Sequence, residues 1–205
     1  MKPPPIVPLK RVIFAAALIP AAALVYDAFT GNLTANPVDY ITDETGTWAL
    51  AMLTISLSVT PVRRITGWNE IIKVRRMLGL FAFFYAVLHM LTWVVLVSFF
   101  DVPTMLDDIV ERPFITVGMG TFLILLALAC TSTKASIRRL GRKWQQLHRL
   151  VYVAGVGAVV HFWWLVKADV TVPLRWATAI GVVLGFRIWW TLRSRTSGVR
   201  TLSRS

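Results

Sequence analysis

Long apolar stretches alternate with short polar segments along this 205-residue chain. Six stretches carry few or no charges, and their lengths approach or exceed the roughly 20 residues that a helix needs to cross a ~30 Å hydrocarbon core. The pattern therefore predicts an all-α integral membrane protein, a six-transmembrane-helix bundle. The predicted spans cover about residues 10–28, 46–62, 77–100, 113–133, 146–167 and 171–192. No internal repeat or interdomain linker is visible, so residues 1–205 are interpreted as a single domain.

The charged residues lie mostly on one side of these six spans. Hydrophobic residues make up 56% of the chain and charged residues only 16%, yet the formal net charge is +12. With the N-terminus inside the cell, only Arg112, Lys167 and Arg175 of the 22 basic residues fall outside, whereas all ten acidic residues except Glu70 do. By the positive-inside rule, this distribution predicts a multi-pass protein with both termini in the cytoplasm. No nucleic acid is needed to explain the charge.

The first predicted span has two interpretations. Its sequence, MKPPPIVPLKRVIFAAALIPAAA, has the basic start, the apolar stretch and the small residues of a cleavable signal peptide. We favour a retained first helix. Cleavage would leave five spans in the same orientation, so the charge distribution does not distinguish the two interpretations.

Three histidines within or beside the spans are the candidates for chemistry. His89 lies midway along the third span, His148 at the inner end of the fifth, and His161 toward its outer end. Ionisable groups inside a span are costly to insert and usually face a site, a cavity or a partner, although some simply form hydrogen bonds between helices. The third and fifth spans run in the same direction. We therefore expect His89 and His161 to lie at similar depths and to face each other.

Two opposed imidazoles without a nearby carboxylate or thiolate favour haem over other cofactors. Cys130 is the only cysteine, which excludes a cysteine-ligated iron–sulfur cluster. Zinc normally takes at least three protein ligands, and His148 lies about 20 Å from His161 along a helix. Haem iron needs only axial ligands because the macrocycle supplies the other four. The sequence thus predicts a haem held by His89 and His161 and used for electron transfer.

Small residues beside His161 predict a shallow groove on the fifth span. Gly157 and Ala158 lie four and three residues before the histidine, on the same helical face, and Ala154 and Gly155 precede them. A flat ring would fit against such a groove. The same residues also permit two helices to pack closely.

His148 is predicted to lie beside a second, inner site. An ideal helix places it about 140° around the axis from His161, so the spacing alone does not stack two haems. Donors for haem propionates or a phosphate would come from Arg75, Arg76, Gln145, Gln146 and Arg149. The alternative is an ordinary interfacial histidine in a basic loop.

Three segments, VRRMLGLFAFFYAVLHMLTW, ERPFITVG and TSTKASIRRLGRKWQQLHRLVYVAGVGAVVHFWWLVK, resemble one known family. This is the MsrQ family, formerly YedZ, of membrane subunits of bacterial periplasmic methionine sulfoxide reductase systems, within the ferric-reductase-like transmembrane group. The resemblance covers nearly the whole chain. The wider group typically holds two stacked b-type haems with two histidines on each of two helices. Here His148 and His161 match the later pair, whereas the earlier helix has only His89, and the place of its inner histidine falls near Arg75.

The resemblance implies an inner-membrane electron-transfer subunit, itself not catalytic, that binds one or two haems b. Its partner would be a periplasmic molybdopterin-containing methionine sulfoxide reductase that repairs oxidised proteins, and its donor the quinone pool or a flavin reductase. The family is also associated with FMN, for which His148, Arg75 and Arg76 are the predicted site. Two alternatives are a stand-alone transmembrane ferric reductase, and a transporter or assembly factor whose histidines relay protons or pack.

Overall fold

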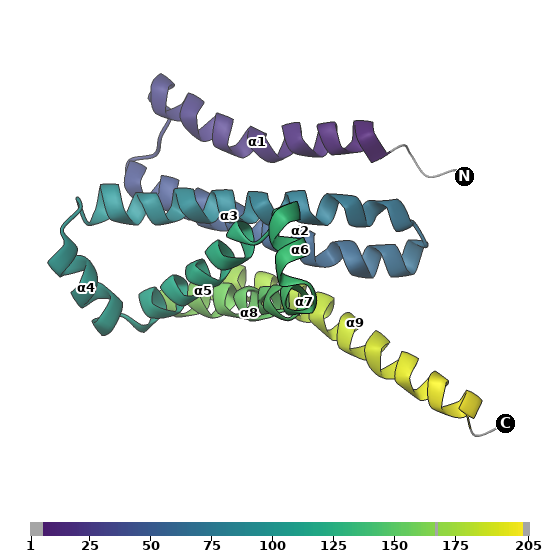
Figure 1. Cartoon of the computed structure of the whole chain (residues 1–205). Helices are drawn as coiled ribbons and strands as arrows, with labels where there is room; N and C mark the ends of the chain where they lie inside the picture. Colours follow the sequence, from purple (N-terminus) through teal and green to yellow (C-terminus); the bar gives the residue numbers. More distant parts are fainter. Residues whose placement is uncertain (1–5, 167, 203–205) are drawn as a thin grey trace.

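The computed structural model describes residues 6–166 and 168–202, and every regular element within these ranges is helical. In chain order the elements are α1 (Ile6–Thr30), α2 (Pro37–Thr66), the 3₁₀-helix η1 (Asn69–Val74), α3 (Arg75–Leu91), the π-helix η2 (Thr92–Val97), α4 (Val102–Glu111), α5 (Pro113–Cys130), α6 (Lys134–Leu140), α7 (Arg142–His148), α8 (Leu150–Leu165) and α9 (Thr171–Leu202). The long helices lie alongside one another (Figure 1). Lys2, Lys167 and Arg204, which the charge argument uses, lie outside the described residues.

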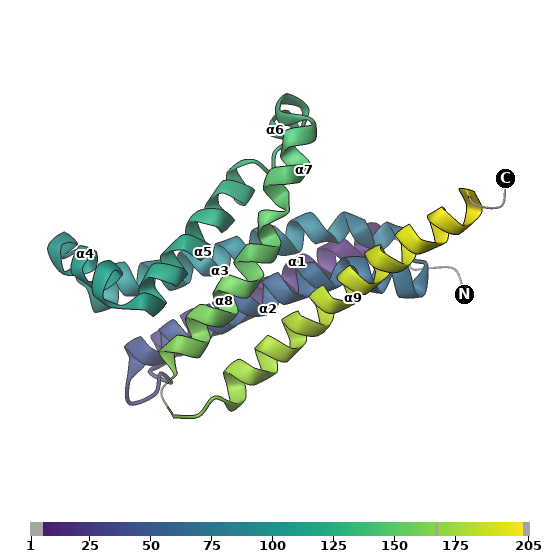
Figure 2. The same ribbon diagram turned by 90° about the horizontal axis from the view of Figure 1, so that it is seen from below.

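Five helical segments are long and apolar enough to cross a membrane: α1, α2, the continuous η1–α3–η2, α5 and the first 24 residues of α9. The remaining predicted span corresponds to α8, which has 16 residues and continues the line of α7 (Figure 2). The two helices are joined at Arg149, whose backbone is itself right-handed helical. Residues 142–165 thus extend about 36 Å at 1.5 Å per residue, enough to cross a hydrocarbon core. The predicted all-α membrane bundle is confirmed.

Different short helices lie at the two ends of the bundle. The α4 end holds the connection from α1 to α2, helix α4, and the connection from α8 to α9, whereas the α6 end holds the turn from α2 to η1 and helices α6 and α7 (Figures 1 and 2). At the α6 end, α2 stops at Gly67, whose φ of 72° is left-handed. Glycine adopts this conformation at little cost. The chain therefore turns back at once, and α3 returns antiparallel along α2.

The buried core lies mainly between α2 and α3. Its members include Leu53, Leu57, Leu78, Ala82 and Tyr85, all nearly or fully inaccessible. By contrast, α1, α8 and α9 expose many large apolar side chains. Lipid tails solvate such side chains as well as a protein interior does, so these helices suit contact with a bilayer.

Hydrogen bonds of Tyr85 hold α1 to the core beside Pro20. Pro20 lies within α1 and lacks the N–H that a helix interior normally uses. Beside it, the Tyr85 hydroxyl donates to the carbonyl of Ala17 at 2.7 Å and accepts from the N–H of Ala21 at 3.2 Å. A side chain has thus entered the hydrogen-bond ladder of α1, which is a common cause of a helix bend.

Replacing Tyr85 with phenylalanine is expected to loosen α1. The substitution keeps the buried ring and removes both hydrogen bonds, which should lower the free energy of unfolding by about 1–2 kcal/mol. Denaturant titration in detergent micelles measures this change. The control is Tyr26→Phe, because the Tyr26 side chain is exposed. Equal stability of the two variants would show that Tyr85 does not hold α1.

Candidate functional site

His89 lies on α3 near the α4 end and is oriented by α2. Its Nδ1 is 3.0 Å from the backbone carbonyl oxygen of Thr42. Gly46, one turn further along α2, leaves room for the ring, because a Cβ atom there would lie 3.1 Å from both Nδ1 and Cε1. A carbonyl oxygen only accepts hydrogen bonds, so Nδ1 carries the proton and Nε2 keeps its lone pair.

His161 is oriented in the same way on α8, by α5. Its Nδ1 donates to the backbone carbonyl oxygen of Phe114 at 2.6 Å. A Cβ atom at Gly118 would lie 2.6 Å from Nδ1 and 2.8 Å from Cε1, closer than Cβ atoms approach other atoms in proteins. Glycine is therefore required for this position of the ring. The carbonyl again fixes the tautomer and leaves Nε2 as the free nitrogen.

The two arrangements are related by a constant shift of 72 residues, from Thr42 to Phe114, from Gly46 to Gly118 and from His89 to His161. In both, the histidine follows its carbonyl partner by 47 residues. The hairpin of α2 and α3 thus corresponds to the pair α5 and α8, and both histidines end the pattern Ala-x3-Ala-Val-x-His. The prediction that the chain contains no internal repeat is wrong.

The two histidine rings meet in one cavity. Their centroids are 6.0 Å apart and their planes lie at 80° to each other. The cavity has a volume of about 720 Å³ and is bounded by α2, α3, α5, α8 and the start of α9, with mainly apolar walls. This volume lies within the usual range for cofactor pockets. We call it the histidine cavity.

The two histidines of the cavity suit a metal-containing cofactor whose own ring supplies most of the metal's ligands. Two imidazoles bonded to opposite sides of one metal ion, each at about 2 Å, have ring centroids about 6 Å apart, as His89 and His161 have. Trp93 also lines the cavity, and its buried Nε1 has no hydrogen-bond partner among the described residues. In the same ranges, no cluster of three or more His, Cys, Asp or Glu could hold a bare metal ion. The donor set fits haem.

The small residues before His161 pack helices together and do not form the predicted groove. A Cβ atom at Gly157 would lie 2.4 Å from the hydroxyl of Thr121 on α5, and one at Gly155 would lie 3.2 Å from Leu57. Only Ala158 of the four small residues lines the cavity. The alternative interpretation, close helix packing, is therefore the one that the structure supports for Gly155 and Gly157.

His148 lies apart from the histidine cavity, at the α6 end. Its Nε2 is 3.1 Å from the hydroxyl of Thr131, and its ring stacks on Trp144 with centroids 4.0 Å apart. Arg75 is close enough for its charge to act on His148, and Arg76 is exposed beside it on α3. The shift of 72 residues relates His148 to Arg76, so the earlier half has a basic residue where the later half has a histidine.

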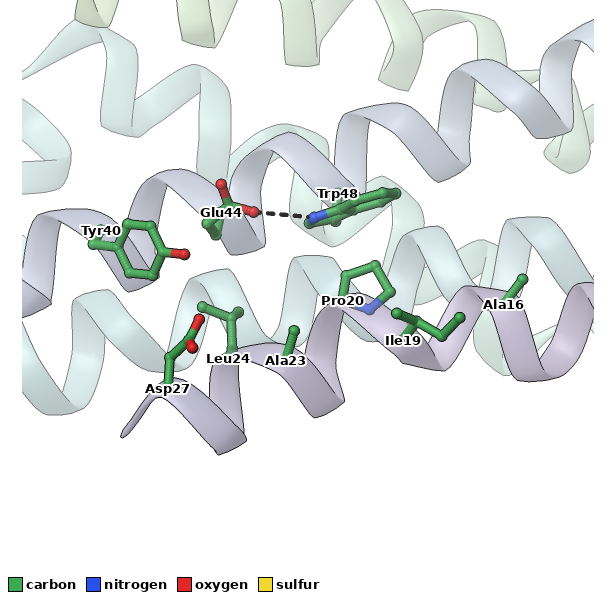
Figure 3. A pocket seen from close by; sticks show the side chains of 9 residues that line it. All are labelled: Ala16, Ile19, Pro20, Ala23, Leu24, Asp27, Tyr40, Glu44 and Trp48. Atoms are coloured by element: carbon green, nitrogen blue, oxygen red, sulfur yellow. Dashed lines mark hydrogen bonds between the residues drawn. The ribbon is translucent and has the colours of Figure 1, made fainter. Parts of the chain in front are cut away.

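A second cleft, of about 410 Å³, separates α1 from α2 on the opposite face of α2 (Figure 3). It shares no lining residue with the histidine cavity. Tyr40, Glu44 and Trp48 face it from α2, and the Trp48 indole N–H donates to a Glu44 carboxylate oxygen at 3.1 Å. Asp27 faces it from α1. None of the predicted site residues lies in this cleft.

Comparison with known proteins decides the family. The model of the family described as ferric reductase like transmembrane component matches residues 45–159. A protein of Herminiimonas arsenicoxydans is 46% identical over 197 residues, which cover 95% of this chain and 90% of that protein, and is named protein-methionine-sulfoxide reductase heme-binding subunit MsrQ. The chain belongs to the MsrQ family. The resemblance inferred from the sequence is thus confirmed.

Other relatives of this MsrQ family member carry the same name. The protein of Ralstonia nicotianae is 47% identical over 185 residues, covering 89% of this chain and 85% of that protein. The protein of Bordetella pertussis is 44% identical over 189 residues, covering 90% and 92%. No solved structure matches the chain. The matched family region contains His89 and His148, and His161 lies two residues beyond its end.

Proposed function

We propose that this MsrQ family member is the haem-binding electron-transfer subunit of a methionine sulfoxide reductase system. One observation carries the proposal: His89 and His161 come from different helices into one cavity. Each has Nδ1 bonded to a backbone carbonyl, which leaves the lone pair on Nε2, and no partner of Nε2 is found among the described residues. This is how protein histidines are usually prepared to bind a metal. The names of the MsrQ relatives, as heme-binding subunits, agree with it.

In this proposal His89 and His161 would hold a haem b through their Nε2 atoms. Haem, when bound, supplies an iron that accepts and releases one electron at a time. The carbonyls of Thr42 and Phe114 fix the two rings and make their Nε2 atoms better ligands. With both imidazoles holding the iron, no coordination position would be left for oxygen or a substrate. The role that follows is electron transfer.

A second cofactor site is proposed at the α6 end, around His148, Arg75 and Arg76. The guanidinium groups would bind the phosphate of FMN or the propionates of a second haem. The positive charge of Arg75, which acts on His148, supports this grouping. If His148 is to bind iron through Nε2, the Thr131 hydroxyl that now faces this atom must move.

The charge distribution supports a proposal for the membrane orientation of the protein. We propose a bacterial inner-membrane protein with both termini in the cytoplasm, so that the α4 end faces the periplasm. His89 and His161 lie toward that end, since they contact the second turn of α2 and the first turn of α5. Electrons from the quinone pool or a flavin reductase would leave there for a molybdopterin-containing methionine sulfoxide reductase in the periplasm.

The proposed function is tested by measuring whether the reductase and its substrate together oxidise the reduced chain. The purified chain, reduced under anaerobic conditions in lipid nanodiscs, is mixed with the periplasmic reductase and a peptide that contains methionine sulfoxide. We expect the reduced absorption bands to disappear only when both are present. Rapid oxidation by ferric citrate alone, with no effect of the reductase, would instead support a stand-alone ferric reductase, the alternative that the family description suggests.

A further inference from the structure

Helix α9 is held to the bundle by an arginine at the α6 end. Arg187 donates from Nη2 to the backbone carbonyl of Leu57 at 2.6 Å and from Nη1 to the hydroxyl of Tyr152 at 2.7 Å. The Leu57 carbonyl needs a donor from outside its helix, because the residue four positions later is Pro61, which has no N–H. Arg187 therefore has a structural role, and this role fixes its positive charge between α2, α8 and α9.

The charge of Arg187 has no carboxylate partner within the described part of the chain. The ion pairs there are Lys73 with Glu70 and Arg112 with Asp108. Instead, Arg64 on α2 and Arg75 on α3 are near enough to repel Arg187. A guanidinium has five N–H donors, and Arg187 uses two of them on Leu57 and Tyr152. A partly buried group of like charges in a membrane protein usually has an anionic partner.

The surroundings of Arg64 and Arg187 suit an amphipathic anion. The guanidinium of Arg64 lies 5.4 Å from the ring centroid of Trp190, and this arginine–tryptophan pair is typical of the level of lipid headgroups. Exposed apolar side chains flank the two arginines on α2 and α9: Ile65, Ile188, Trp189 and Leu192. A soluble anion gains nothing from these side chains, whereas acyl chains would cover them.

We propose that the surface formed by Arg64 on α2 and Arg187 on α9, at the α6 end, binds the headgroup phosphate of an anionic phospholipid. Arg64 and Arg187 bind the phosphate, Arg75 adds positive charge, and the acyl chains lie along the exposed apolar faces of α2 and α9. Basic pockets between transmembrane helices commonly bind anionic headgroups in this way. The site is separate from the histidine cavity, and it shares only Arg75 with the second cofactor site proposed around His148.

Native mass spectrometry of the purified chain tests the proposal with short-chain phosphatidylglycerol as the probe. We expect one bound molecule, with phosphatidylcholine binding at least tenfold more weakly. The variant Arg64→Gln should weaken phosphatidylglycerol binding about fivefold, since each basic residue near the surface contributes about 1 kcal/mol. The matched control is Arg138→Gln, an exposed arginine of α6 at the same end of the bundle, which should bind as the wild type does.

Further measurements distinguish weaker lipid binding from misfolding, and a lipid phosphate from a soluble anion. Arg187→Lys retains the charge but not the two-pronged donor, and we expect it to bind phosphatidylglycerol less tightly while circular dichroism confirms its helical content. Equal binding of phosphatidylglycerol and phosphatidylcholine, or unchanged binding by Arg64→Gln, would overturn the proposal. So would displacement of the lipid by millimolar inorganic phosphate or FMN, because the site would then recognise a soluble anion.

Discussion

Replacing His161 with alanine is expected to remove the bound haem, and His89→Ala is expected to do the same. A bis-histidine iron that loses one imidazole loses half of its protein ligands, and no third histidine is among the described residues that line the cavity. We expect haem content to fall at least tenfold in either variant. Haem per chain is measured from the pyridine haemochrome spectrum after purification.

The control for these variants is His148→Ala. Its ring contacts Thr131 and Trp144 at the α6 end, away from the histidine cavity, so the haem held by His89 and His161 should remain. All three variants must show wild-type helical content by circular dichroism. If His161→Ala retained its full haem content while His148→Ala lost it, the proposed assignment of the ligands would be wrong.

Replacing Gly118 with alanine is expected to have nearly as large an effect, although residue 118 itself offers no side-chain ligand. The new Cβ atom would lie 2.6 Å from Nδ1 of His161, so the ring must move and its hydrogen bond to the Phe114 carbonyl must break. Loss of such a supporting hydrogen bond typically lowers metal affinity 10- to 100-fold. Titration of the haem-free protein with hemin measures the affinity.

Gly120 supplies a matched control on the same helix. A Cβ atom at Gly120 meets no other atom within 4 Å, so Gly120→Ala should bind haem normally. Both substitutions replace glycine with the best helix former, which favours an exposed helix by about 1 kcal/mol. Reduced haem affinity in Gly118→Ala without lower stability of α5 would separate an effect on His161 from unfolding. Gly46→Ala should have a smaller effect, because its closest approach to His89 is 3.1 Å.

The hydrophobic pattern was sufficient to predict the membrane bundle, because burial in lipid demands long uncharged helices whatever their order. The approach of His89 to His161 also follows from the sequence, since two spans with the same direction bring residues of similar depth together. The groove near His161 was predicted wrongly. Small residues serve helix packing and ligand binding equally well, and only the position of Thr121 distinguishes the two.

The hydrogen-bond acceptors that orient the two histidines could not be predicted from side-chain patterns, because they are backbone groups. The carbonyls of Thr42 and Phe114 leave no signature in side-chain chemistry, and the glycines that admit the rings resemble any other helical glycine. A signal was nevertheless present. Both His89 and His161 follow a glycine by 43 residues and end the same Ala-x3-Ala-Val-x-His pattern. The similarity is short because the two halves contact different neighbours outside the site.

Low-temperature electron paramagnetic resonance of the oxidised, purified protein tests the central claim most directly, since it reports how the haem iron is coordinated. Ligation by His89 and His161 predicts a low-spin ferric signal typical of two imidazole ligands, present in His148→Ala and lost in His89→Ala and His161→Ala. A high-spin signal from five-coordinate iron in the wild-type protein, or folded protein that binds no haem at all, would contradict the account.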